Sequence, residues 1–557
     1  MVLVFVAATT VGSFASAAEL GTDEQRAAGK KLYEKHCVQC HGEKGDGLGP
    51  AAAFFRPPPR DFTSGKFKVR RTANGELPTD DDIKVAIIKG LAFKRDGAFT
   101  GMPPWQFADD ELSNLVYYIK SFSSDFADPQ YNNPKVVSLS SAPPYTDQSA
   151  ELGRKVFENN ECIKCHGNLG RGDGKSAPTL KDDWGFHIRP ADLTKRFTFR
   201  GGGSREDIFR TVSTGFNGTP MPSYLDSVSE EDRWHLVNYI HSLSLRNTPS
   251  YNTADAPILS VYVEQPSLEF TDLSAARKSF ESAPSSYIPI VGQVIQPGRE
   301  FFPLVNELEV RSIYTENEIA LLIVWHDIRK DTSGKNAPDM EVPKFEAPKM
   351  PVAEAQGTGG DPFAEESAAA ASDPFADEAA DAPTEASSSQ YSDAIAVQFP
   401  AVLPAADDFK RPYFILGDEK HPVELWFADL AKAKGELYIG KGSDKLAMSD
   451  KSNFTLIAGY NEGEWVAIFS RKREADGSIN FPETRFIPIA FSVWDGFNEE
   501  RGSKRGLTSW FSLFLSPKEK PSVLAPMLIY GGGIFIIEFA IVALVRWNAR
   551  RREESNV

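Results

Sequence analysis

The chain has 557 residues, of which 41% are hydrophobic and 25% are charged, so it is long enough for several folded domains. Its formal net charge of −16 argues against nucleic-acid binding, which needs a basic surface, and is compatible with docking to a basic partner.

The first segment, Val2 to Phe14, consists of apolar or small residues and is followed by the small-x-small triplet Ala15-Ser16-Ala17. This pattern predicts a secretory signal peptide at residues 1–17, cleaved before Ala18. No Lys or Arg precedes the apolar run, so either this region is atypical or the true start lies upstream. The alternative is a buried N-terminal helix, which we disfavour because a polar helix start follows directly.

Residues 20–247 contain the same pattern twice. The triplet at residues 37, 40 and 41 recurs 125 positions later, as Cys162, Cys165 and His166. The stretches "GKKLYEKHC", "RPPPRDFT" and "DDELSNLVYYIKSF" also recur, as "GRKVFENNEC", "IRPADLT" and "EEDRWHLVNYIHSL". A domain-sized period predicts two copies of one domain, at residues 18–130 and 145–248. Each copy is predicted to hold a helix before the cysteines, a Gly-rich loop, a short helix, a Met-Pro loop and a final amphipathic helix.

All four cysteines of the chain lie in these two Cys-x-x-Cys-His motifs, and this motif is the attachment signature of a c-type haem. The two thiols bond to the vinyl groups of one haem, and the next residue places an imidazole under the iron. The sequence therefore predicts two haem c groups, one on Cys37 and Cys40 and one on the second pair. His41 and His166 are the predicted proximal ligands. A redox Cys-x-x-Cys is the alternative, but that chemistry would not need a duplicated His.

Met102 and Met221 are the only methionines of the repeated half, and each precedes a Pro between the short helix and the final helix. A lone Met usually fills a core. Two at equivalent positions predict the second axial ligands instead, and His/Met ligation raises the haem potential. The rival sixth ligands are His36, His187, His235 and His241, of which the last two have no counterpart in the first copy and are expected at the surface.

From about Ala254 onward, short β-branched and aromatic runs predict a mainly-β domain at residues 255–515. Examples are "EIALLIVWHD", "AIAVQFP", "HPVELWFAD" and "FTLIAGYNEGEWVAIFSRK". Within this domain, residues 337–390 are rich in Ala, Asp, Glu, Pro and Ser, which predicts a disordered acidic insertion. A solvated helix is the alternative for its Ala-rich parts.

The apolar run from Val523 to Val545 is long enough to cross a bilayer as one helix. Four arginines follow it, which predicts that residues 546–557 form a cytoplasmic tail. The haem domains would then lie on the periplasmic side of the cell membrane, held by a single span. Glu538 lies in the middle of that span and should face a protein partner or water.

The repeated half resembles the class I cytochrome c family over nearly all of residues 20–247. That resemblance implies an all-α fold around each haem and one-electron transfer. The later half resembles the haem b-binding γ subunit of ethylbenzene dehydrogenase-type molybdoenzymes, through "LLIVWHD", "DAIAVQFP", "HPVELW" and "PIAFSVWDGFNEERGSKRGLTSW". This second resemblance implies a β-sandwich that exchanges electrons with an iron–sulfur subunit.

The γ-subunit family ligates haem b with a Met and a Lys. Lys504 matches the Lys, but Ile415 and Leu416 stand where the Met is expected. Either His421 or Met448 replaces the Met, or the sandwich has lost its haem b and only docks partners.

Together these features predict a membrane-anchored dihaem cytochrome that carries electrons between a molybdenum and iron–sulfur oxidoreductase and a respiratory chain. We expect an electron-transfer subunit rather than a stand-alone enzyme. The alternatives are a dihaem peroxidase, a thiosulfate-oxidising cytochrome, or a structural anchor subunit of an oxidoreductase complex. Met ligands in both copies argue against a peroxidase, which needs one open iron position.

Overall fold

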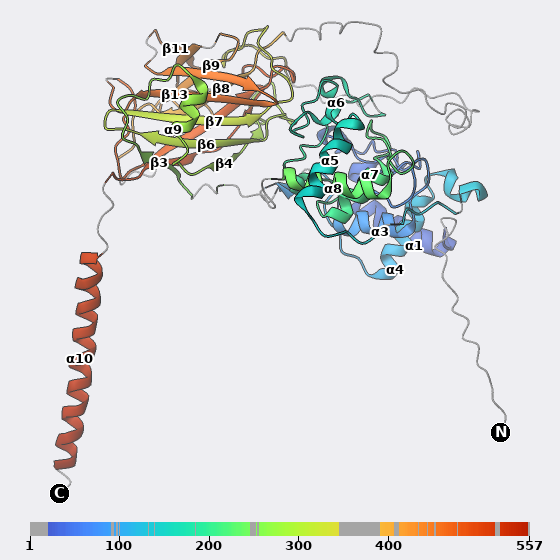
Figure 1. Ribbon diagram of the computed structural model, residues 1–557, viewed down its shortest axis with the longest axis horizontal. Helices are drawn as coiled ribbons and strands as arrows, with labels where there is room; N and C mark the ends of the chain where they lie inside the picture. The colour runs from blue at the N-terminus through green and yellow to red at the C-terminus, as the bar shows by residue number, and fades with distance from the viewer. Residues whose placement is uncertain are drawn as a thin grey trace.

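The computed structural model describes residues 20–554 except 91–93, 96–97, 100, 132, 139, 184, 245–251, 253–255, 345–389, 406–410, 433, 443, 451–452, 476 and 519–523. It confirms the predicted order of a helical region, a sheet-rich domain and one C-terminal apolar helix (Figure 1). The predicted signal peptide and most of the predicted acidic insertion lie outside the described residues. The described start of that insertion contacts the sheet-rich domain, since the Ala337 carbonyl accepts a hydrogen bond from Gly502 N at 3.2 Å.

The first helical unit contains α1 (Asp23–His36), α2 (Val38–His41), α3 (Asp80–Lys89) and α4 (Asp109–Lys120). A capping box starts α1: Thr22 Oγ1 accepts from Gln25 N, and the Gln25 side chain accepts from Thr22 N. Helices α1 and α4 pack against each other, and their apolar residues enclose a core that includes Tyr33, Leu115 and Val116.

The second helical unit repeats this plan with α5 (Asp147–Asn159), α6 (Ile163–His166), α7 (Arg205–Thr214) and α8 (Glu230–Leu243). Both units need a glycine where their first and last helices cross. A Cβ on Gly29 would lie 2.0 Å from the Asn114 carbonyl oxygen, and one on Gly153 would lie 1.9 Å from that of His235. Each glycine begins a matching stretch of the repeat, so the close helix crossing is encoded in both copies.

The sheet-rich domain is built from fourteen strands of the described chain: β3 (Ile258–Tyr262), β4 (Ser286–Pro289), β5 (Val291–Gly292), β6 (Glu307–Tyr314), β7 (Glu318–His326), β8 (Ala394–Pro400), β9 (Val423–Asp429), β10 (Lys434–Gly440), β11 (Leu446–Met448), β12 (Thr455–Asn461), β13 (Glu464–Lys472), β14 (Phe486–Trp494), β15 (Gly506–Leu507) and β16 (Phe511–Leu515). The main pairing order is β11-β10-β9-β8-β14-β16-β3-β6-β7-β13-β12.

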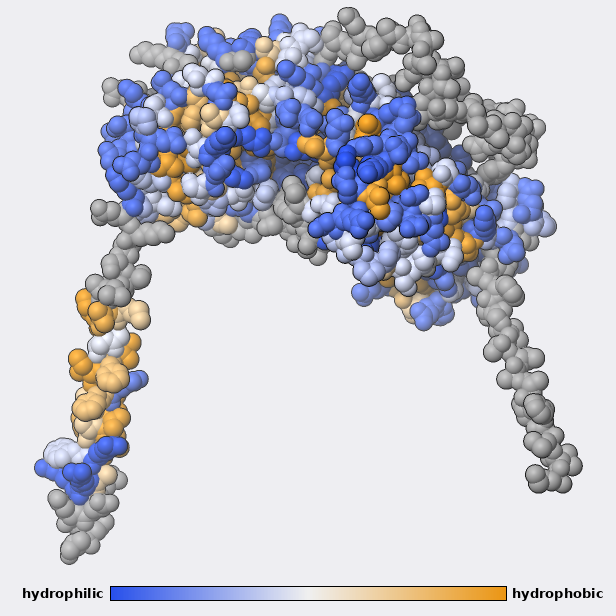
Figure 2. All heavy atoms as spheres, in the orientation of Figure 1, coloured by the Kyte–Doolittle hydropathy of each residue, from blue (hydrophilic) through white to orange (hydrophobic). Residues whose placement is uncertain are grey.

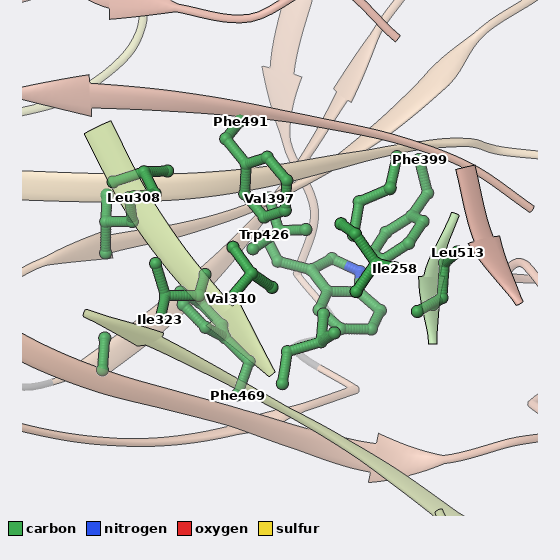
Figure 3. Packing of buried hydrophobic residues seen from close by; sticks show 14 of the residues in the cluster. Ile258, Leu308, Val310, Ile323, Val397, Phe399, Trp426, Phe469, Phe491 and Leu513 are labelled. Carbon is green, nitrogen blue, oxygen red and sulfur yellow. The ribbon is translucent and has the colours of Figure 1, made fainter. Parts of the chain in front are cut away.

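Strand β14 joins two layers, because its first half pairs with β16 and its second half pairs with β8. Buried side chains from both layers meet between them. Val310 and Ile323 lie opposite Trp426 and Phe399 in this core (Figure 3). The predicted sandwich is therefore present, and a short helix, α9 (Leu273–Ser279), packs against the outer face of one layer.

The last helix, α10 (Leu524–Glu554), contains the stretch Met527–Arg551, which is long and apolar enough to cross a membrane. Its hydrophobic side chains are exposed along its length, whereas its C-terminal end is hydrophilic (Figure 2). Helix α10 extends away from the domains (Figure 1).

The second helical unit is fixed to the sandwich by polar contacts. Arg171 forms an ion pair with Glu464 at 3.3 Å, and Lys195 forms one with Glu307 at 3.2 Å. The two helical units also contact each other: Arg70 donates a hydrogen bond to the Thr214 carbonyl at 3.1 Å. These contacts join the second helical unit to the sandwich and the two helical units to each other.

Candidate haem sites

The first Cys-x-x-Cys-His motif spans the end of α1 and the single turn α2. Cys37 N donates to the Tyr33 carbonyl at 2.8 Å, and His41 N donates to the Cys37 carbonyl at 2.9 Å. Residues three apart on a helix share a face, so Cys37 and Cys40 face the same cavity. Both thiols are free, and burial raises the pKa of Cys37 to about 12. Two sulfurs on one face can bond to two neighbouring substituents of a single group.

His41 is held with one ring nitrogen available to a metal. Its Nδ1 lies 2.9 Å from the Arg60 carbonyl oxygen, which can only accept a hydrogen bond, so the proton is on Nδ1 and Nε2 keeps its lone pair. Burial lowers the pKa of His41 to about 4, which keeps the imidazole neutral at pH 7. The ring is stacked on Phe62, with centroids 4.4 Å apart. This is the state that a haem iron ligand requires.

The second motif has the same geometry. Cys162 and Cys165 lie one helical turn apart, and both thiols are free. His166 Nδ1 lies 3.0 Å from the Ala191 carbonyl oxygen, and burial lowers the pKa of this histidine too. The structure therefore brings together each predicted set of two cysteines and one histidine.

A short turn with an Asp and a Thr follows each of the carbonyls that orient the histidines. Asp61 Oδ1 accepts from the amide and the hydroxyl of Thr63, at 2.8 and 2.6 Å. Asp192 Oδ1 accepts from the amide and hydroxyl of Thr194, at 3.0 and 2.6 Å. Each turn directly follows the carbonyl that orients the histidine. The signal was visible as an Asp-x-Thr pattern in both copies of the repeat, within "PRDFT" and "PADLT".

Both Met-Pro loops reach the same cavity as the cysteines. Met102 lies between α3 and α4, and Met221 lies between α7 and α8; both line the cavity. The loops are tied back to the preceding helices, since Trp105 N donates to the Ile87 carbonyl at 3.1 Å and Tyr224 N donates to the Val212 carbonyl at 3.0 Å. Each Met therefore lines the same cavity as the histidine of its own domain.

The cavity has a volume of about 1490 Å³. Pockets for one small ligand or cofactor measure roughly 300–1,000 Å³, so this cavity is larger than a single site. Both Cys-x-x-Cys-His motifs and both Met-Pro loops line it, together with apolar side chains such as Ile83 and Leu236. The size of the cavity and the two motifs that line it fit more than one haem.

Basic side chains line the same cavity. Burial lowers the pKa of Lys68 to about 7, and lowers the pKa values of Arg60 and Arg200 to about 10. A charged group is costly in such an environment unless an opposite charge lies nearby. Asp182 and Asp183 supply part of that charge to Lys68 and Arg60, and the carboxylates that haem carries would add to it, so this cation set also fits a haem.

The rival histidines have other neighbours. His36 lies at the cavity wall against the rings of Trp105 and Phe107, and His187 also reaches the wall, with Nε2 at 3.1 Å from the Ala177 carbonyl. His235 and His241 were expected at the surface. They are instead half-buried, hydrogen-bonded to Ser149 and to Arg196, and outside the cavity lining.

Lys504 lines this cavity as well, although it belongs to the sandwich. Its Nζ donates to the Asn498 carbonyl at 2.6 Å and lies 3.6 Å from a Glu300 oxygen. Ile415 and Leu416 are buried in a separate apolar cluster of the sandwich that includes Trp494. His421 contacts Asp418, with Nδ1 at 3.2 Å from Oδ1, and Met448 is 60% exposed.

The sandwich adds a histidine that the sequence did not indicate. His326 ends β7, is half-buried, and lines the cavity. Burial lowers the pKa of His326 to about 4, so the ring is neutral. Its position beside the cytochrome-like units depends on the packing of domains far apart in the chain, and no local motif marks it.

A family model described as cytochrome c matches residues 26–123 and again residues 150–244. The N-terminal half of the chain contains two cytochrome c domains. This confirms the predicted tandem arrangement, and such domains imply covalently bound haem c and electron transfer.

Relatives among characterised proteins include respiratory subunits. A protein of Haloferax mediterranei named as a respiratory nitrate reductase heme subunit, ORF7, is 26% identical over 157 residues, which are 28% of this chain and 55% of that protein. The cbb3-type cytochrome c oxidase subunit FixP of Bradyrhizobium diazoefficiens is 25% identical over 229 residues, which are 39% of this chain and 61% of the relative. The chain thus spans between half and two thirds of the length of these relatives.

Among solved structures, a chain of a reducing HAO-like protein complex of Kuenenia stuttgartiensis is 38% identical. The match covers 41% of this chain and 99% of the other, with a TM-score of 0.37.

Proposed function

We propose that the protein is a membrane-anchored dihaem c-type cytochrome that transfers electrons between an oxidoreductase and a respiratory chain. One observation carries this proposal: both Cys-x-x-Cys-His motifs open into a single cavity. Two redox groups in one cavity form a continuous electron path without a substrate pocket. The relatives named as nitrate reductase and cbb3 oxidase subunits support respiratory redox proteins as partners.

In this proposal each cytochrome domain holds one haem c, which supplies a one-electron Fe(II)/Fe(III) couple. The domains span residues 18–130 and 145–248. The residues that would ligate each iron are the histidine of the motif and the Met of the same domain, His41 with Met102 and His166 with Met221. Thioether ligation would favour the reduced iron and leave no open position for peroxide, so it would favour electron transfer over peroxidase chemistry.

Backbone carbonyls and other side chains of the cavity would act on the environment of the haems. The Arg60 and Ala191 carbonyls hold the histidine protons on Nδ1. The apolar lining excludes water and raises the potential, while Lys68 and Arg200 offset the carboxylate charge of the haems.

The sandwich, residues 255–515, is proposed to close the shared cavity and to dock the partner. Its resemblance to the haem b-binding γ subunit suggests a molybdenum and iron–sulfur oxidoreductase as that partner. Lys504 would be a haem b ligand only if another side chain completed the pair. The Met position holds Ile415 and Leu416, both buried in apolar packing, so we propose that haem b is bound substoichiometrically or not at all.

The proposed location is the cell membrane, with α10 as a single span, the haem domains on the periplasmic side and residues 546–557 in the cytoplasm. The arginines after the apolar stretch support this orientation.

The test is purification of the full chain from native membranes, with pyridine haemochrome analysis and identification of co-purifying proteins. We expect two haem c groups, less than one haem b, and a metal-containing oxidoreductase in the preparation. Cys37→Ala and Cys162→Ala should each remove one haem c, whereas Met448→Ala, at an exposed position outside the cavity lining, should remove none. One haem c or none in the unmodified protein would refute the proposal.

A further inference from the structure

Three carboxylates meet inside the sandwich, away from the cysteines and methionines of the haem sites. One oxygen from each of Asp327, Asp393 and Asp495 lies within 4.8 Å of the others, and all three residues are buried. They follow β7, precede β8 and follow β14, so they lie where three strands of the two layers end. Burying three carboxylates together is strongly unfavourable without a positive charge between them.

One of these oxygens has no protein partner. Asp327 is 2% exposed, and its Oδ1 accepts from Arg329 N at 3.0 Å, but its Oδ2 is buried without a hydrogen bond. Buried carboxylate oxygens are nearly always satisfied, so an orphan oxygen beside two other carboxylates indicates a missing electropositive ligand.

Hydrogen bonds from backbone amides and from a Trp side chain orient the other two carboxylates. Asp393 Oδ1 accepts from Gly496 N at 2.9 Å, and its Oδ2 accepts from Asp331 N and Trp465 Nε1, at 2.7 and 3.0 Å. Asp495 Oδ1 accepts from Asn498 N at 3.1 Å. Such bonds orient ligands around a metal and leave further lone pairs free to coordinate it.

The positive side chains near the three carboxylates do not offset all of their negative charge. Asp331 is neutralised by Arg329, whose Nη2 lies 2.7 Å from Asp331 Oδ1. Arg189, from the second cytochrome domain, is the other cation whose charge acts on Asp495 and Asp327. The charge of Arg189 is shared with the buried Glu500, which also acts on Asp495, so Arg189 offsets at most one of the three carboxylates and a divalent cation would offset the others.

We infer that Asp327, Asp393 and Asp495 form a calcium-binding site in the sandwich. All the donor atoms are oxygens, which favours a hard cation over zinc or copper. Calcium–oxygen bonds measure about 2.3–2.6 Å, so oxygens around the ion lie up to roughly 5 Å apart, and the three oxygens here, all within 4.8 Å of one another, satisfy that limit. Magnesium usually keeps several waters and binds only one or two carboxylates, so three buried carboxylates favour calcium.

The site would couple the sandwich to the cytochrome domains. The loop after β7 carries Asp327, and the residue before it, His326, lines the haem cavity. Arg189 lines the same cavity and donates to the Leu304 carbonyl of the sandwich at 2.8 Å. Calcium bound to the three carboxylates would fix the ends of β7, β8 and β14. It would thereby also fix the part of the sandwich that contacts the second cytochrome domain.

Shared protons are the alternative way to relieve the charge. Burial raises the pKa values of Asp327 and Asp393 well above their usual range, and a protonated carboxyl could donate to its neighbour. Shared protons and bound calcium predict different effects of Asp327→Asn on the stability of the sandwich. An amide can replace a protonated carboxyl with little loss, but it removes a charged ligand from a calcium site.

The experiment uses the full-length haem-loaded protein in detergent, treated with EDTA and dialysed. Metal content is measured by mass spectrometry after addition of CaCl2 or MgCl2, and unfolding is followed by scanning calorimetry. We expect about one calcium per chain and a rise of at least about 3 °C in the Tm of the sandwich with calcium, and a much smaller rise with magnesium.

Asp327→Asn should lower calcium retention about tenfold or more and abolish the calcium-dependent rise in Tm. Asp429→Asn is the matched control, because Asp429 is a fully buried carboxylate of the same sandwich that bonds to Ser392 and Ala431 instead. It should lower the Tm but keep the calcium response. If Asp327→Asn does not fold, calcium binding by the EDTA-treated unmodified protein decides alone. Absence of bound calcium there, or an equal response to magnesium, would overturn the assignment.

Discussion

Met102 and Met221 each depend on one atom, the thioether sulfur, for their proposed role. Replacing either with Ala should remove about half of the weak long-wavelength band of Met-ligated ferric haem. It should also lower one midpoint potential by on the order of 0.1 V, a fraction of the roughly 0.8 V range set by axial ligands. Optical redox titration measures both effects. Met448→Ala is the control, since Met448 is exposed and outside the cavity. A variant with unchanged spectrum and potential would show that its Met only packs.

Lys68 provides a pH-dependent test at the same scale. Burial, with the nearby charges of Arg60 and Arg200, lowers its pKa to about 7, and a haem carboxylate would raise it toward its ordinary value of 10.5. In the haem-loaded protein, deprotonation as the pH rises through this raised pKa removes a positive charge from the cavity, and this favours ferric iron. At least one haem potential should therefore fall as the pH rises from 7 to 10. Lys68→Met should lower that potential at pH 7 and flatten its pH dependence.

Lys66 is the control for that measurement, because it is half-exposed and paired with Asp183 at 3.2 Å. Lys66→Met should leave the pH dependence intact. If both variants behave alike, the pH dependence arises elsewhere.

Local chemistry explains which site residues could be predicted. The cysteines and histidines form contiguous motifs, and the methionines were located by comparing the two copies. His326 and Arg189 could not be recognised in the same way, because each gains its meaning from a neighbour in another domain. The Asp-x-Thr turns lie between these cases: both copies carry them, but their role depends on a backbone carbonyl.

The sequence predicted individual helices and strands better than it predicted which of them pair. The short helix predicted between the Gly-rich loop and the Met-Pro loop is α3 in the first copy and α7 in the second, and the hydrophobic runs of the later half are strands β7, β8, β9, β12 and β13. Periodicity reveals an element but not its partner. The division of β14 between two layers, and the parallel pairing of β3 with β6 and β16, depend on contacts distant in sequence and had no local signal.

The crossing of α5 and α8 gives a prediction at the scale of elements. Gly→Ala in an exposed helix interior usually stabilises by roughly 0.5–1 kcal/mol. At Gly153 the new methyl group would collide with the His235 carbonyl, so Gly153→Ala should instead destabilise the second cytochrome domain by about 1–3 kcal/mol. Denaturant titration followed through haem absorbance measures the change. Lys155→Ala, on the exposed side of α5, should stay within about 0.5 kcal/mol. A stabilised Gly153→Ala variant would contradict the close crossing.

At the scale of the molecule, function depends on how three folded units and one helix are joined. The cytochrome domains share their cavity with the sandwich, and ion pairs such as Arg171 with Glu464 hold that arrangement. The sequence predicted each unit separately. The shared cavity follows only from their packing, because surface loops of one unit close the site of another.

Helix α10 gives the last prediction. Its apolar side chains, including Ile534 and Phe535, are exposed to the extent of 59% and 70%, which only a lipid or protein environment would cover favourably. A chain that stops after Ser516 keeps the sandwich, whose last strand ends at Leu515, and should therefore fold and retain its haem c. It should move from the membrane pellet to the supernatant on fractionation. Protease added to spheroplasts of cells with the full chain should digest the haem domains and spare a C-terminal tag. Protected haem domains would reverse the proposed orientation, and a truncated chain that stayed in the pellet would show a second membrane attachment.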